Sequence, residues 1–225
     1  MSSTAEERIA RRTRWERRTR VPLILFGLLF IVSYSLYVLA PDLPPLARLI
    51  LLTDLVVVWI VFLVDYVVRL AITPTGHRFA FVRANIIDLM SVVVPVFRAF
   101  RVISLLSDIP YFRARTPTAV RVEVISYAVS YAVLFVYFLS LATLNAERDA
   151  PDATITSFGN AIWWACVTLA TVGYGDTYPV TVEGRIYAVM LMAGGVAIVG
   201  TASALVISYL SERMRGLNRH GEGHS

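Results

Sequence analysis

The residues with the clearest potential for chemistry lie at 168–176, where the sequence reads Thr-Leu-Ala-Thr-Val-Gly-Tyr-Gly-Asp. Glycine at 173 and at 175 permits backbone angles that other residues avoid, so consecutive carbonyl groups can face the same way. Val172 and Tyr174 then point outward into packing. Carbonyl oxygens that face one axis can replace the water of a cation in a narrow pore, and the hydroxyl of Thr171 can add a further ring of oxygens. The pattern predicts coordination of a cation by main-chain oxygen.

Charged side chains within apolar stretches form a second group. Phe62, Asp65 and Arg69 have the spacing F-x-x-D-x-x-x-R, and Asp88 follows Asn85 in the run Asn-Ile-Ile-Asp-Leu. Carboxylates are costly inside a bilayer, so both acids are expected to face the interior of a helix bundle and to pair with arginine. These residues are candidates for a buried ionic site.

The composition indicates which elements must position these residues. The chain has 225 residues, of which 57% are hydrophobic and 16% charged, and its mean hydropathy is +0.65. These values exclude a disordered protein and argue against a soluble domain, because soluble chains carry about 25% charged residues and lack bilayer-spanning apolar runs. Cys166 is the single cysteine, so no intrachain disulfide can form, and no secretory cleavage pattern follows the basic start. We interpret the chain as an all-α integral membrane protein.

Apolar runs predict six membrane crossings of about 20 residues each, the length that spans roughly 30 Å of hydrocarbon. They lie at 22–40, 46–72, 84–94, 96–108, 119–145 and 183–211. The third and the fourth are short and meet at Pro95. A seventh apolar run, 155–170, has polar borders and predicts a re-entrant helix that enters the membrane and returns.

The arginine residues predict the topology. All 21 basic residues are Arg, and most lie before Val21, in loops on the side of the two termini, or at the end of the chain. The positive-inside rule therefore places both termini in the cytoplasm of a multi-pass cell-membrane protein. Two interpretations of the Arg-rich start, which includes Trp15, carry equal weight: a surface helix that binds anionic lipid head groups, or a solvated arm. A nucleic-acid partner is not expected, because topology already explains the charge.

The sequence around the glycine pattern resembles the pore domain of tetrameric potassium channels over about residues 119–213. The resemblance rests on TVGYGD at 171–176, the preceding Trp163-Trp164 pair, Tyr-Pro-Val-Thr at 178–181, and the long helix that contains Gly194-Gly195. It implies potassium as the permeant ion and a homotetramer, since a ring of carbonyl groups needs several identical contributions. The implied selectivity filter, in which the carbonyl groups of the first four residues bind potassium, consists of Thr171, Val172, Gly173, Tyr174 and Gly175.

The same resemblance implies residues that support the filter and form the gate. Asp176 is expected to hydrogen-bond the indole of Trp164, with Trp163 and Val167 beside them, and Val167 stands where one bacterial branch of the family has glutamate. The C-terminal end of the re-entrant helix carries about half an electron of negative charge, which favours a cation. Gly194 and Gly195 are implied as a bending hinge, and close packing of small residues is a second, compatible interpretation. The implied cavity and inner-gate residues are Ile198, Ala202 and Val206.

The first four crossings look like a voltage-sensor domain. In that family an aromatic plug and two acids pass arginines one at a time, which implies these roles for Phe62, Asp65 and Asp88. A purely structural role stays open, in which the acids neutralise a fixed arginine and hold the helices together. The fourth crossing departs from the family, because the charges at three-residue spacing stop after Arg98 and Arg101. Two charges per subunit predict weak voltage dependence, or a sensor-like domain that does not gate.

The predicted organisation has five parts. They are a basic cytoplasmic arm at 1–21, a four-helix voltage-sensor-like domain at 22–108, a linker at 109–118, a two-helix pore domain with a re-entrant pore helix and selectivity filter at 119–213, and a cytoplasmic tail at 214–225. The tail is too short for a ligand-binding domain, so ligand gating from that end is not expected. The sequence contains no phosphate loop, metal-ligand cluster or paired nucleophile, so neither an enzyme nor a cofactor beyond permeant potassium is expected. The expected function is passive potassium conduction by a prokaryotic channel, and the alternative is a non-conducting membrane sensor or scaffold with the same fold.

Overall fold

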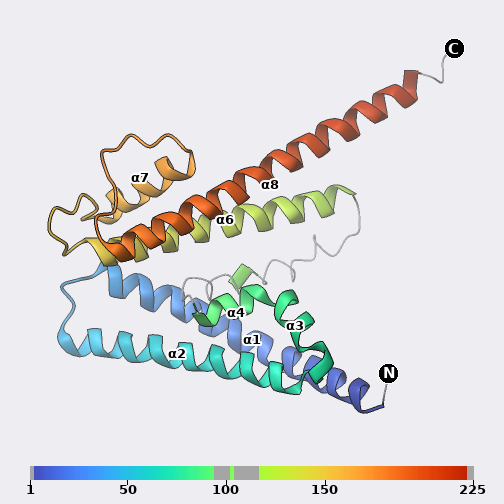
Figure 1. The fold of residues 1–225 in the computed structure, drawn as a ribbon, viewed down its shortest axis with the longest axis horizontal. Helices are drawn as coiled ribbons and strands as arrows, with labels where there is room; N and C mark the ends of the chain where they lie inside the picture. The colour runs from blue at the N-terminus through green and yellow to red at the C-terminus, as the bar shows by residue number, and fades with distance from the viewer. Residues whose placement is uncertain (1–2, 94–101, 104–116, 222–225) are drawn as a thin grey trace. The chain divides into compact units, whose positions relative to one another are not determined.

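The computed structural model describes residues 3–93, 102–103 and 117–221, and within these ranges every regular element is a helix (Figure 1). The predicted all-α fold is confirmed for that part of the chain. The chain divides into two compact units, Met1–Leu141 and Ala142–Ser225. The division falls within one long helix, so the first part of that helix belongs to one unit and its last turns belong to the other.

The first unit begins with a pair of long helices. Its helices are α1 (Ser3–Leu39), α2 (Pro45–Ile72), η1 (Thr75–His77), α3 (Arg78–Ala84), α4 (Ile86–Val93) and the first part of α6 (Pro117–Glu147). Helix α1 packs along α2 after a short turn (Figure 1). Proline sets both ends of α2: Pro45 opens it with a ring that fits the first helical turn, and Pro74 follows its extended cap residue Thr73.

Four of the helices are long and apolar enough to cross a membrane. The candidate spans are Glu7–Leu39, Pro45–Ile72, Val122–Glu147 and Val182–Ala204, and the shorter apolar helix is Phe158–Leu169. They match the first, second, fifth and sixth predicted crossings and the predicted re-entrant helix. The third predicted crossing begins within the described residues, whereas Pro95, Arg98, Arg101 and most of the linker at 109–118 lie outside them.

The third predicted crossing differs from the structure at its start. The sequence predicts a helix from residue 84, but α3 ends at Ala84 and α4 starts at Ile86, with Asn85 between them in a non-helical conformation (φ −120°, ψ 40°). The side-chain amide of Asn85 donates to the Phe81 carbonyl over 2.9 Å. Asparagine favours such local bonds to the backbone over a continuous helix, which explains the break.

Aromatic rings connect α1 to α6 inside the first unit. Phe30, on α1, stacks on Phe138, on α6, with ring centroids 5.7 Å apart, and both side chains are fully buried. Tyr34 stacks on both rings, and the hydroxyl groups of Ser35 and Tyr137 hydrogen-bond over 2.7 Å. Aromatic pairs of this kind add about 0.5–1.5 kcal/mol beyond their buried area, so this cluster holds the part of α6 around Tyr137 and Phe138 against α1.

The second unit contains the end of α6, α7 (Phe158–Leu169) and α8 (Val182–Gly221). Ser157 caps α7 by accepting a hydrogen bond from the backbone N–H of Asn160 over 3.2 Å. Helix α7 packs against α8 at a glycine, because a Cβ atom on Gly195 would come within 2.9 Å of the side chain of Leu169. This close approach brings the C-terminal end of α7, and the loop that follows it, to the middle of α8.

Candidate functional site

The loop after α7 has an alternating backbone. Thr171, Gly173 and Gly175 have positive φ angles of 58°, 59° and 78°, whereas Val172 and Tyr174 between them do not. Residues that alternate between left-handed and right-handed conformations turn successive peptide groups the same way, so that their carbonyl groups share one side of the chain. The loop therefore has the backbone geometry needed to present a row of carbonyl oxygens.

Thr171 holds a conformation that usually requires glycine. Its N–H donates to the Thr168 carbonyl and the Val172 N–H donates to the Val167 carbonyl, each over 3.0 Å. These two bonds form a Schellman motif, in which the left-handed residue after the helix cap is most often glycine. A β-branched residue there costs about 1–3 kcal/mol, and strain of this kind persists at functional sites when the side chain itself is needed. The helix end thus points to a role for the Thr171 hydroxyl.

The residue after the loop is held by a tryptophan of α7. The Trp163 indole donates to Oδ2 of Asp176 over 2.7 Å, and its ring stacks on Tyr174 with centroids 5.7 Å apart. The prediction that Trp164 makes this bond is wrong. Neighbouring residues of a helix point about 100° apart, so only one of the two indoles can face the loop, and Trp164 is buried with 5% of its surface exposed.

Glu147, at the end of α6, is a site residue that the sequence did not reveal. Its fully buried carboxylate accepts hydrogen bonds from the N–H groups of Val180 and Thr181, over 2.8 and 2.9 Å, and from the Thr181 hydroxyl over 2.6 Å. Thr181 in turn caps α8, since its hydroxyl oxygen accepts the Gly184 N–H over 2.9 Å. An acid at the end of an apolar run resembles an ordinary interfacial residue, and nothing in the sequence marks partners more than thirty positions away.

The predicted hinge and gate residues lie along α8. Gly195 is buried against Leu169, and Gly194 beside it is half-buried. Ile198 is half-buried in the isolated chain, whereas Ala202 and Val206 are exposed. The three lie four residues apart and so share one face of the helix.

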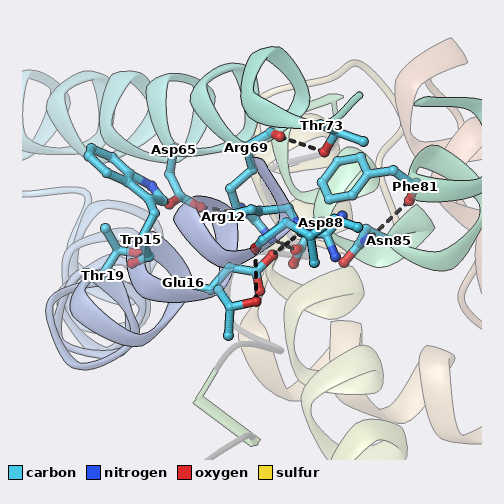
Figure 2. Close-up of polar contacts among 12 residues, drawn as sticks. Arg12, Trp15, Glu16, Thr19, Asp65, Arg69, Thr73, Phe81, Asn85 and Asp88 are labelled. Atoms are coloured by element: carbon cyan, nitrogen blue, oxygen red, sulfur yellow. Dashed lines mark hydrogen bonds and ion pairs between the residues drawn. The ribbon is translucent and has the colours of Figure 1, made fainter. Parts of the chain in front are cut away.

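The first unit holds the predicted ionic site (Figure 2). Arg69 pairs with Asp65 over 2.9 Å and with Asp88 over 2.6 Å, and its side chain is only 6% exposed. The two acids therefore share one guanidinium, which comes from the same F-x-x-D-x-x-x-R motif. Phe62 is buried one turn before Asp65. The described cluster shows both acids paired with Arg69, whereas Arg98 and Arg101 lie outside the described residues, so both interpretations of the acids stay predictions.

Side chains from α1 complete this ionic site, and the sequence did not predict them. The Trp15 indole donates to Oδ1 of Asp65 over 3.1 Å, and the Arg12 guanidinium lies 5.3 Å from the centre of the Phe81 ring (Figure 2). The Arg-rich start is helical as far as Ser3, and one of its faces packs on the ionic site. The sequence offered one sign of this contact, a tryptophan at position 15 among arginines, but its hydrogen-bond partner Asp65 lies fifty residues away.

A further acid of α2 also went unnoticed in the sequence. Asp54 lies three helical turns before Asp65 on the same face of α2. Oδ2 of its carboxylate accepts a hydrogen bond from the buried Ser33 hydroxyl of α1 over 2.5 Å. A carboxylate within an apolar span needs such partners, so this bond also fixes α1 against α2.

Comparisons with known proteins agree with this arrangement. Residues 122–212 match the model of an ion channel family. A cyclic nucleotide-gated potassium channel of Mesorhizobium japonicum, mll3241, is 30% identical over 214 residues, which cover 84% of this chain and 57% of the relative. The chain is thus similar to potassium channels of the voltage-gated-like superfamily.

Animal voltage-gated potassium channels match a shorter part of the chain. Potassium voltage-gated channel subfamily V member 2 of Mus musculus is 34% identical over 82 residues, covering 36% of this chain and 15% of the relative. Subfamily A member 6 of Homo sapiens is 40% identical over 73 residues, covering 32% of this chain and 14% of the relative. The chain therefore spans little more than half of the bacterial relative and a much smaller part of the animal ones.

Because Asp65 and Asp88 both pair with Arg69, the ionic site can be tested by measuring stability. We expect Arg69→Leu to lower the free energy of unfolding by about 3–5 kcal/mol, because removing one partner of a buried ion pair leaves uncompensated charge. Arg78→Leu, at an exposed position of α3, is the matched control and should change it by about 0.5 kcal/mol or less. Denaturant unfolding in detergent micelles measures both, and equal losses would contradict the structural role of Arg69.

The Glu147 contact gives a second test, which uses glycine substitutions in α8. A Cβ atom at Gly184 would collide with Oε1 of Glu147 and come within 2.9 Å of Pro179, whereas one at Gly200 would meet no atom within 4 Å. We expect Gly184→Ala to lower the free energy of unfolding by about 1–3 kcal/mol. Gly200→Ala should be neutral or slightly stabilising, because alanine is the better helix former. A Gly184→Ala protein as stable as Gly200→Ala would show that Glu147 is not fixed at this position.

Proposed function

We propose that this chain is the subunit of a passive potassium-selective channel. The observation that carries the proposal is the alternating backbone at 171–175, which can present consecutive carbonyl oxygens to one axis. The permeant potassium ions would bind the carbonyl groups of Thr171, Val172, Gly173 and Tyr174. The relatives whose names include potassium channel support the choice of ion. Conduction would follow the electrochemical gradient, and no enzymatic step is proposed.

The proposed channel is a homotetramer. One chain carries a single filter loop, and a ring of ligands around an axis requires several copies related by rotational symmetry. Much of the surface of the loop is exposed in the isolated chain, with 54% of Val172 and 66% of Tyr174 accessible. Neighbouring copies would cover this surface and complete the ring. The arrangement of arginines further supports a six-crossing chain with both termini on the cytoplasmic side of the membrane.

Anionic lipid is the proposed partner of the Arg-rich start of α1. Arg11, Arg14 and Arg18 are exposed and spaced three and four residues apart, so they share one face of the helix. Arg12 and Trp15 face the ionic site instead. A row of guanidinium groups at the cytoplasmic surface attracts anionic head groups by about 1 kcal/mol per charge. The flux assay below is therefore made in neutral and in anionic vesicles, and higher activity in anionic vesicles is expected.

Ion flux tests the proposed conduction. Liposomes that contain the purified protein should take up potassium, exclude sodium and be blocked by barium. Gly173→Ala should abolish uptake, because the φ angle of 59° at this position strains any residue with a side chain, although within the single chain a Cβ atom there meets no neighbour within 4 Å. Gly76→Ala, which also meets no neighbour but has no positive φ, is the matched control and should conduct normally.

Two results of this assay would count against the proposal. Equal uptake of both ions would exclude a selective filter. Assembled wild-type protein that passes neither ion would favour the alternative, a non-conducting membrane sensor or scaffold. The pairing of Arg69 with both acids supports this alternative, because it gives the first unit a structural role that does not require ion flow.

The proposed channel depends only weakly on voltage. One charge that crosses the whole field gains about 2.3 kcal/mol per 100 mV, so two arginines in each of four subunits supply at most about 18 kcal/mol. Strongly voltage-gated channels move 3 to 4 charges per subunit, about twice as much. In planar bilayers we expect open probability to change shallowly between strongly negative and strongly positive voltages. A steep change would show that charges other than Arg98 and Arg101 move.

A further inference from the structure

Thr154 connects the segment before the pore helix α7 to the segment after the filter. Its hydroxyl group donates to the Tyr178 carbonyl over 2.9 Å, and its Oγ1 accepts the Tyr178 N–H over 2.8 Å. The Thr154 carbonyl accepts the side-chain amide of Asn160 over 3.3 Å, and Asn160 also donates its N–H to the cap residue Ser157. One threonine thus satisfies both backbone groups of Tyr178 and joins them to the start of α7.

This contact belongs to a series of tethers along residues 176–181. Asp176 is held through its side chain by Trp163, and the N–H groups of Val180 and Thr181 are held by Glu147. Tyr178, in the middle, is held through its backbone by Thr154. Side chains from three places in the sequence hold this non-helical segment, and Thr154 supplies the tether in the middle.

We propose that Thr154 is a positioning residue for the outer end of the filter. The proposal rests on the proposed potassium conduction, and Thr154 itself contacts no ion. Tyr178 lies three residues beyond Gly175, so its position sets the direction in which the chain leaves the filter. When this tether is lost, the contacts of Asp176, Val180 and Thr181 remain, but the outer carbonyl groups have less support from the protein and rely more on the bound ion. Conduction then depends on the external potassium concentration that keeps the outer site filled.

The test compares two threonines in the same segment. Thr154→Val removes the hydroxyl group and preserves the shape of the side chain, whereas Thr154→Ser preserves the hydroxyl group. Thr156→Val makes the same chemical change at an exposed position two residues away. In planar bilayers we expect the current of Thr154→Val to decay about tenfold faster at low than at high external potassium. The factor corresponds to about 1.4 kcal/mol, which is the net contribution expected of the two hydrogen bonds that this substitution removes. Thr154→Ser and Thr156→Val should behave as the wild type does.

Two further measurements test the role of Thr154, and the second of them does not depend on the proposed potassium conduction. If Thr154→Val does not assemble, a tandem dimer with one substituted copy should show an intermediate decay rate. Amide hydrogen exchange does not require conduction: the Tyr178 N–H should exchange about tenfold faster in Thr154→Val than in Thr156→Val.

Different results would overturn the role of Thr154 and the proposed potassium conduction. Wild-type decay in Thr154→Val or in the tandem dimer, or an equal effect of Thr156→Val, would overturn the role of Thr154. Unchanged exchange at Tyr178 would also overturn it. Wild-type vesicles that pass no potassium would overturn the proposed function, while faster exchange at Tyr178 would still support the tether.

Discussion

In the proposed function the loop at 171–175 is a filter that replaces the water around an ion, so its carbonyl oxygens must be left without protein partners, and this constraint shapes the second unit. Regular helices and strands use those oxygens in their own hydrogen bonds, so neither can form here. The alternating backbone at 171–175 instead places a β-branched threonine in the left-handed region, at a cost of about 1–3 kcal/mol. The rest of the unit has to supply the stability that the loop cannot supply for itself.

The supporting contacts come from the two ends of the loop rather than from its middle. At the inner end, the Schellman bonds to Thr168 and Val167 continue α7 into the filter. At the outer end, Trp163 holds Asp176 and Glu147 holds the segment before α8. Val167 presents no carboxylate to this region, so the indole is the side chain that holds Asp176 in the described structure. The filter therefore depends on contacts from α6 and α7 as well as on its own sequence.

Local patterns explain which features the sequence could predict. Hydropathy predicted the long helices, because each depends only on its own residues, and TVGYGD predicted a loop with unusual backbone angles because its glycines permit them at fixed spacing. The contacts of Glu147, Trp15 and Asp54 depend on residues twenty or more positions away, which no local pattern records. The choice between Trp163 and Trp164 depends on the rotation of α7 about its axis. A pair of adjacent tryptophans does not specify that rotation.

The two buried acidic sites also show why similar residues acquire different roles. Asp65 and Asp88 both pair with the guanidinium of Arg69, and Asp65 also accepts the Trp15 indole, so that site includes a charge that could in principle be exchanged for another. Glu147 is satisfied by two backbone N–H groups and a hydroxyl, which are part of the chain at fixed positions and cannot be exchanged. A carboxylate bound by backbone donors can only hold a segment in place, whereas one bound by a cation can also respond when the cation moves. The chemistry of their partners thus distinguishes Glu147, which holds the segment before α8 in place, from the Asp65–Arg69–Asp88 cluster, in which an ion could be exchanged.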